Sequence, residues 1–323
     1  MATSSSVNYA VTRDDIITEA YQICGVVGEG GTANANQLTD GARTLNMMVK
    51  AWNAKLGLPL WAIEKLVLFP IKAQADYSFG ASADRMCKTS ELVKTELAAA
   101  VTANDTTITV DSVTGMANGD VIGVQTDSGG IIWTTISDGA LDTTIDLAAA
   151  ITSDAAVNNN VYTYTTAFAQ RILGVENAWR KTDGGTDIPI SIISRQEYID
   201  LSDKTSAGVV NQVYYDPQLA TGVLSLWQVP SDSQTEELIY LRATRILEDF
   251  DASGDTPDFP QEWYLALCWG LAVLRGPSLG VMGRDYADIK ATAKEILEDT
   301  MDFDTEDGSL FIMPENSQGS YRR

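Results

Sequence analysis

The 323-residue chain contains no histidine and only three cysteines, and these two shortages exclude much of enzyme chemistry. Without histidine there is no Ser-His-Asp or Cys-His nucleophile pair, no imidazole general base and no histidine-ligated zinc. Three widely spaced cysteines cannot form a four-thiolate metal site, so Cys24, Cys87 and Cys268 are expected to be buried, reduced thiols of a protein made in a cytoplasm. We expect no enzyme activity, no cofactor and no catalytic or metal-binding residues.

Several sequence signals of binding or targeting are also missing. No GxxxxGK[ST] loop occurs, and no GxGxxG follows a strand-like run. The glycines at Gly28–Gly31 have neither a lysine nor a preceding apolar strand, which is typical of a plain loop. No run approaches the roughly 18 consecutive apolar residues that a membrane span needs. The polar N-terminus does not resemble a signal peptide, so we expect no contact with a membrane.

Carboxylate pairs are the one catalytic option that the composition leaves open, because the chain has 44 acidic residues. A peptidoglycan hydrolase could use two such groups in a cleft, with Glu262, Glu295 and Glu298 as candidates. A calcium loop at Asp302–Gly308 would need a glutamate at its twelfth position, where the chain has Met313. In a chain with 44 acidic residues, carboxylates at these spacings occur by chance, so they are weak evidence for either the hydrolase or the calcium loop.

The scarcity of basic residues gives the chain a formal net charge of −22. No lysine or arginine occurs from Thr95 to Gln170, a stretch that contains nine carboxylates. From Ile246 to Leu310 there are fifteen carboxylates and four basic residues. Such a surface repels nucleic-acid phosphates. It suits either a well-solvated protein or a wall past which a polyanion slides without binding.

Helical periodicity marks both ends of the chain. Thr12 is placed to cap a first helix that ends near Gly25, and a second helix is expected from about Gln37 to Lys55. Two more helices are expected after Pro260, the second one reaching Met301. The tail that follows is polar except for one short apolar run, Leu310–Met313, which is typical of a segment that docks on another surface.

The middle of the chain has strand-like patterns. Residues 103–166 are rich in Thr, Val, Asp and Gly, with short strands near ten-residue spacing, which predicts a small all-β module of sandwich or barrel type. The stretch YYDPQLATGVLSLWQVP, from Tyr214, predicts a β-hairpin that turns at Pro217 and Gly222. The run ELIYLRATRI is expected to pair with this hairpin, and Ser194 with Glu197 predicts a capping box.

These patterns together predict an α+β fold. Its α-helical host domain would be formed by the N- and C-terminal helices, with an antiparallel β layer and an inserted small all-β module. The expected parts are N-terminal helices and first strands (1–102), the inserted module (103–166), the hairpin layer with the closing helical pair (167–301) and a C-terminal docking tail (302–323).

Two stretches resemble a known family. The segment from Asp14, DDIITEAYQICGVVGEGGTANANQLTDGARTLNMMVKAWNAKLGLPLW, resembles the start of the head-to-tail adaptor proteins, or tail accessory factors, of short-tailed bacteriophages. The segment from Pro257, PDFPQEWYLALCWGLAVLRGPSLGVMGRDYADIKATAKEILEDTM, is similar to their closing helical pair. The hairpin is similar to a segment of larger phage proteins of this kind. The small family members lack the β insertion and the full β layer.

The resemblance implies a structural virion protein at the head-tail junction, assembled in the host cytoplasm. Family members form a ring of about twelve copies that joins the portal protein to the tail nozzle or to spikes and fibres, and they extend the channel for genomic DNA without binding it specifically. It further implies portal binding by the closing helix and the tail, here through Leu310, Phe311, Ile312, Met313, Tyr321, Arg322 and Arg323.

A ring also needs two different contact patches on each subunit, and we expect the hairpin to supply one as an edge strand. The ring-contact candidates are Tyr214, Tyr215, Leu224, Leu226 and Trp227. Three alternatives stay open. They are a tail-tube, nozzle or other head-completion ring protein, the carboxylate-dependent peptidoglycan hydrolase, and a glycan-binding protein that uses Trp133, Tyr162 and Tyr164, whose alternation in strands is otherwise typical of a core.

Overall fold

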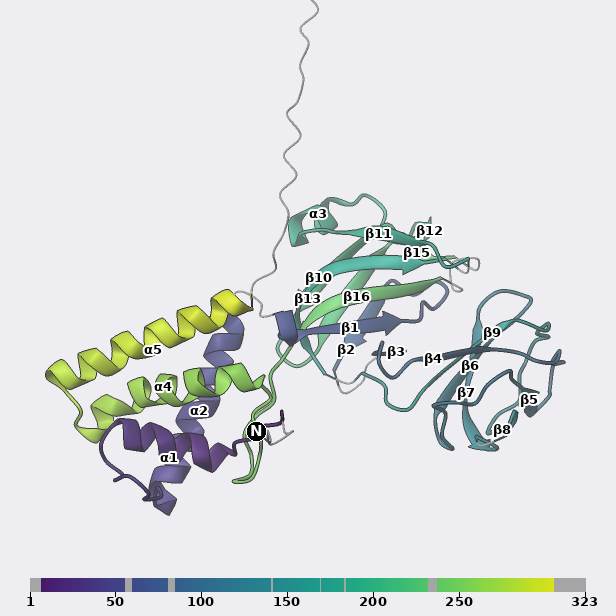
Figure 1. Cartoon of the computed structure of the whole chain (residues 1–323). Coiled ribbons are helices and arrows are strands. Elements are labelled where there is room, and N and C mark those ends of the chain that lie inside the picture. Colours follow the sequence, from purple (N-terminus) through teal and green to yellow (C-terminus); the bar gives the residue numbers. More distant parts are fainter. Residues whose placement is uncertain are drawn as a thin grey trace, which may run out of the picture. The chain divides into compact units, whose positions relative to one another are not determined.

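The protein is divided into two compact units. The computed structural model describes residues 7–55, 60–80, 85–140, 142–168, 170–182, 184–231 and 237–304. The helical unit combines Met1–Trp61 with Asp249–Arg323, and the β unit is Ala62–Glu248. Figure 1 shows the long helices of the first unit and the strands of the second.

The helical unit is organised around α4, which contacts each of the other long helices. This is because α4 is the most apolar of them and buries Ala266, Leu267, Cys268, Leu271 and Ala272. By contrast, no side chain of α5 is fully buried, and only one face of that helix packs on α4. The long helices are α1 (Arg13–Ile23), α2 (Ala35–Lys55), α4 (Tyr264–Arg275) and α5 (Gly283–Phe303), with short 3-10 turns η1 (Leu60–Ala62), η3 (Gln261–Trp263) and η4 (Gly276–Leu279).

Local sequence signals act as expected at several positions. Thr12 and Asp15 form a capping box at α1, in which the Asp15 carboxylate accepts a hydrogen bond from the Thr12 backbone N–H at 2.9 Å. Ser194 and Glu197 form the same arrangement at α3 (Arg195–Asp200). Both predictions are confirmed. The three cysteines are buried and unbridged, which confirms the prediction for their thiols.

The Thr12→Ala variant is expected to lose about 1 kcal/mol of stability at pH 7, the usual value of such a cap. Hydrogen bonds from Thr12 lower the pKa of Asp15. A carboxylate with a lowered pKa stabilises the fold above its unfolded pKa and loses this contribution as the pH falls through the folded value. The difference between wild type and variant should therefore shrink below about pH 4. Urea unfolding from pH 3 to 7 measures it. Thr39→Ala, which removes an exposed hydroxyl within α2, should show no such pH dependence.

The β unit contains an eight-stranded sheet that curls around its own core. Its order is β2-β14-β13-β11-β10-β16-β1-β3, and β11 with β13 is the one parallel pair. Tyr77 and Phe79 from one edge strand and Met86 from the other belong to the same buried cluster, so the two edges curl toward each other. The strands are β1 (Ile63–Leu68), β2 (Asp76–Phe79), β3 (Met86–Lys88), β10 (Ile172–Lys181), β11 (Asp187–Ile192), β13 (Gln212–Pro217), β14 (Gly222–Trp227) and β16 (Leu238–Arg245), beside a small pair of β12 (Ala207–Gly208) and β15 (Val229–Pro230).

The second sheet of the β unit closes into a small barrel. Its order is β4-β9-β6-β7-β8-β5, and beyond its two edge strands a bridge joins Leu97 to Val110. The Ala98 N–H donates to the Thr109 carbonyl at 2.9 Å, which completes the ring of strands. Closure removes the exposed strand edges of an open sheet. The strands are β4 (Val93–Glu96), β5 (Thr107–Thr109), β6 (Val121–Gln125), β7 (Ile131–Asp138), β8 (Thr144–Leu147) and β9 (Asn160–Tyr164).

An aromatic cluster joins the barrel to the outer face of the eight-stranded sheet. Phe69, which follows β1, is buried with its ring centroid 4.6 Å from that of Trp133, 5.7 Å from Tyr162 and 5.9 Å from Tyr164. The Arg85 guanidinium lies 5.5 Å from the centroid of the Trp133 ring. Such contacts bury large apolar area in a defined geometry. The core interpretation is therefore confirmed for Tyr162 and Tyr164, which are buried, while Trp133 is half-buried against the same cluster.

The predicted fold class, an α+β protein with an α-helical host domain, is wrong. The protein is mostly β, with sheets of eight and six strands and five helices among the described residues. The physical reason is that each sheet encloses an apolar core without help from the terminal helices. The two main sheet cores contain no residue from α1, α2, α4 or α5. A sheet that curls on itself needs no helical layer to cover its apolar face.

The predicted hairpin is confirmed, but its predicted neighbour is wrong. Strands β13 and β14 pair antiparallel, with Tyr215 opposite Leu224. The run that forms β16 does not pair with them, because it lies between β1 and β10. The strand next to β14 is β2, from an early part of the chain. The hairpin is therefore internal to the sheet, and the expectation that it forms an edge strand is also wrong.

Candidate docking pocket between α2, α4 and α5

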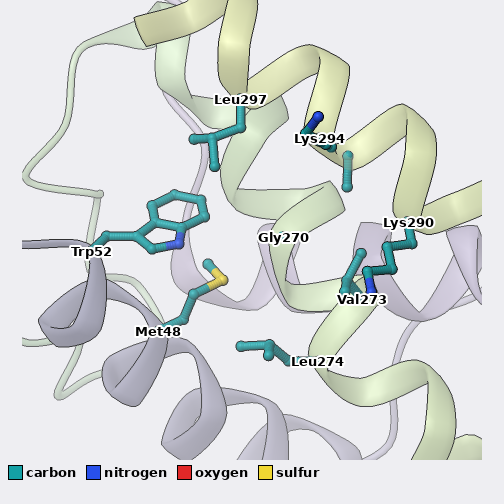
Figure 2. Close-up of a pocket in the computed structure, with 9 residues that line it drawn as sticks. Met48, Trp52, Gly270, Val273, Leu274, Lys290, Lys294 and Leu297 are labelled. Carbon is teal, nitrogen blue, oxygen red and sulfur yellow. The ribbon is translucent and has the colours of Figure 1, made fainter. Parts of the chain in front are cut away.

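An apolar pocket of about 240 Å³ lies between α2, α4 and α5 of the helical unit. Figure 2 shows its side chains converging from the three helices. Apolar groups form the walls, and two lysines from α5 complete the lining. The nine lining residues are Met48, Trp52, Gly270, Val273, Leu274, Lys290, Ala293, Lys294 and Leu297.

The helical repeat explains how these side chains meet. Met48 and Trp52 are four residues apart in α2 and therefore share one face of that helix. On α4, Gly270 leaves the space that the Trp52 ring occupies. A Cβ atom at this position would lie 2.8 Å from that ring and 3.0 Å from the Met48 sulfur. The other side of Trp52 faces Trp263, with ring centroids 6.3 Å apart. Tight packing around Trp52 thus fixes one wall of the pocket.

The lysines of the pocket stand out in an acidic part of the chain. Lys290 and Lys294 are two of only four basic residues between Ile246 and Leu310. The Lys294 ammonium lies 3.2 Å from a Glu298 carboxylate oxygen, while Lys290 is in no ion pair with another described residue. Both lysines are exposed. The pocket therefore combines an apolar interior with a positive margin, which suits an apolar segment that carries acidic neighbours.

The structure places the five ring-contact candidates in two different environments. Tyr215, Leu224 and Leu226 point into the core of the curled sheet, and both leucines are 0% exposed. The Tyr215 hydroxyl donates a hydrogen bond to the Ile172 carbonyl at 2.6 Å. In the folded subunit these three side chains are therefore not available to a second copy.

The two remaining ring-contact candidates lie on the opposite face of the hairpin. The Tyr214 ring stacks on Tyr198 of α3 at 5.1 Å, and its hydroxyl accepts a hydrogen bond from Arg195 at 2.9 Å. The Trp227 indole N–H donates to the Asp203 carbonyl at 2.9 Å. Both side chains are half-buried. Their exposed parts can still reach a neighbouring chain.

The portal-binding candidates, Leu310, Phe311, Ile312, Met313, Tyr321, Arg322 and Arg323, lie outside the described residues. The last described helix, α5, ends at Phe303, close to the start of this tail. Helical periodicity in the sequence predicts that Met48, Trp52, Leu274 and Leu297 lie on apolar helix faces, but it does not indicate that they line a pocket. The usable signal was Gly270, a glycine inside an otherwise apolar helix, which indicates close approach of another element.

The three glutamates considered for carboxylate catalysis lie outside the pocket. Glu262, Glu295 and Glu298 are exposed, and none of them lines the pocket. Among the described residues no group of three or more Asp, Glu or Cys side chains could hold a metal ion. Burial raises the pKa of the Cys87 and Cys268 thiols to about 12, which leaves both protonated and unreactive near neutral pH.

Comparisons with known proteins leave the chain without a family assignment. No protein-family profile matches it, and no curated protein matches it. None of the helices in the described ranges is long and apolar enough to cross a membrane.

Proposed function

We propose that this chain is a structural virion protein, a head-to-tail adaptor that joins the portal to the tail and extends the DNA channel. One observation supports the proposal most directly. The two stretches that resemble the adaptors lie at opposite ends of the sequence, yet they fold into one helical unit. Within that unit α1 and α2 from the first stretch pack on α4 from the second.

The charge of the chain also supports this role. A ring of about twelve copies, each with a net charge of −22, would surround the channel with a negative field. Because DNA phosphates carry the same sign, passing genomic DNA would not adhere to the wall. The barrel contributes strongly, since Thr95–Gln170 contains nine carboxylates and no basic side chain. The partners are then the portal protein, further copies of this chain, and nozzle or spike and fibre proteins. The site of action is the head-tail junction of the virion.

Reconstitution with the portal oligomer tests the proposal. The full chain is mixed with the portal of its phage and imaged by negative-stain electron microscopy, beside a variant that ends at Asp304. We expect the full chain to add a ring to one end of the portal. The shortened chain keeps α5 and loses the tail, and it should add none because the resemblance implies that portal binding needs the tail as well as the closing helix.

A matched variant separates the chemistry of the tail from its length. This variant carries four substitutions, Leu310→Ser, Phe311→Ser, Ile312→Ser and Met313→Ser. They keep the length and charge of the tail and remove the side chains of its apolar run. Binding should fall at least tenfold. If neither the full chain nor any variant joins the portal across a range of salt concentrations, the adaptor role is refuted, and a nozzle or other head-completion position becomes the next candidate.

A further inference from the structure

We propose that the pocket between α2, α4 and α5 is a docking site for the apolar segment Leu310–Met313 of the same copy of the chain. The size of the pocket favours a few side chains over a free small molecule. Its volume of about 240 Å³ is below the roughly 300–1,000 Å³ of common small-molecule sites. Its walls are apolar, as are the four residues Leu, Phe, Ile and Met of this segment.

Chain geometry allows the segment to reach the pocket of its own subunit. Leu310 is the sixth residue after Asp304, which follows α5, and an extended chain of six residues spans about 20 Å. Measured along α5, Leu297 lies about 10 Å back from Asp304 at 1.5 Å per residue, and Lys290 about 21 Å back.

Charge complementarity points to the same occupant. Two carboxylates, Glu306 and Asp307, lie between Asp304 and Leu310 in the stretch that follows α5. Lys290 and Lys294 at the pocket provide the opposite charge on the helix along which that stretch would return. Lys290 and Lys294 are two of only four basic residues between Ile246 and Leu310, so few other positive charges in this part of the chain could attract the acidic stretch. This inference does not depend on the adaptor function, since it concerns the free subunit.

Disulfide trapping in the full chain tests the proposal. Ala293 lines the pocket, while Ala291 is exposed, is not part of the lining and lies about 200° away around α5. Two double variants are compared, Ala293→Cys with Ser309→Cys, and Ala291→Cys with Ser309→Cys. Both leave Leu310–Met313 intact, and both new cysteines on α5 are at nearly the same chain distance from Ser309. Oxidised glutathione drives the exchange, and peptide mass spectrometry identifies the linked residues. The wild-type chain, with its three buried thiols, gives the background.

We expect the intramolecular link from residue 293 to form at least tenfold faster than that from residue 291, independently of protein concentration. Adding Leu310→Ser and Phe311→Ser, which change only the tail, should abolish the difference. Adding Lys290→Glu and Lys294→Glu should reduce it. Equal rates for the two pairs would overturn the proposal. A preference for residue 293 that appears only as concentration-dependent links between chains would overturn it as well, by identifying the tail of a second copy as the occupant.

Discussion

Replacing Phe69 by alanine is expected to lower the free energy of unfolding of the β unit by about 3–5 kcal/mol, the usual cost of deleting a buried aromatic ring. Phe69 is 1% exposed, and its ring touches Trp133, Tyr162 and Tyr164. These aromatic residues connect the barrel to the eight-stranded sheet, so the loss should exceed that of an average core position. Urea unfolding measures the change in free energy.

Hydrogen exchange followed by mass spectrometry locates the effect of Phe69→Ala. Faster exchange is expected in β1, β7 and β9, whose residues surround the lost ring. Peptides from α1 and α4 should exchange as in the wild type, because these helices belong to the other unit. Phe303→Ala is the matched control, since Phe303 is 76% exposed and its loss should change stability by less than about 0.5 kcal/mol. Equal effects of the two variants would contradict the aromatic junction.

Trp263→Ala is expected to be the most damaging single substitution in the helical unit, with a loss of about 3–5 kcal/mol. Trp263 is 2% exposed, and its ring centroid lies 5.8 Å from Trp61, 5.9 Å from Phe259 and 6.3 Å from Trp52. Because the Trp52 ring packs against Trp263, the substitution should also make the Trp52 side chain, which lines the docking pocket, more mobile.

The same exchange experiment measures the effect of Trp263→Ala. Peptides from α2 and α4 should lose protection, while the barrel strands should keep theirs. Trp227→Ala serves as the control, because it removes a half-buried indole from the β unit. Its effect should appear around β13 and β14 and not in the helices. Loss of protection in the barrel of the Trp263 variant would contradict the division into two units.

Local structure could be predicted from the sequence because local groups determine it. The capping residues Thr12 and Ser194 bond to groups three residues away. Pro217 ends β13 and Gly222 begins β14, and the two residues pair with each other at the end of the hairpin, only five positions apart in the chain. In each case the interacting groups are close in the chain, and their chemistry leaves few alternatives.

The arrangement of the sheets could not be predicted because it depends on pairing between distant residues. β14 pairs with β2, whose residues lie far earlier in the chain, and β16 lies between β1 and β10. Alternating apolar residues indicate that a strand has a buried face, but they do not indicate its partner. Closure of the barrel likewise depends on the bridge from Leu97 to Val110, which no local pattern marks.

The docking pocket was only partly accessible from the sequence. Met48, Leu274 and Leu297 fit the amphipathic patterns of three separate helices, so the sequence predicts a buried face for each of them. The sequence does not indicate which apolar helix faces pack together or where they leave a pocket. Both depend on how the side-chain ridges of one helix fit into the grooves of its neighbour. No local sequence pattern indicates that Lys290 and Lys294 line a pocket, which only the structure shows.

Cryo-electron microscopy of the intact virion tests the adaptor role most directly. At the vertex of the head that bears the tail, we expect a ring of this chain between the portal and the rest of the tail. The helical unit and the two-sheet β unit should be identifiable in each subunit of that ring. Density for this chain at another position in the tail, or its absence from the vertex, would contradict the account.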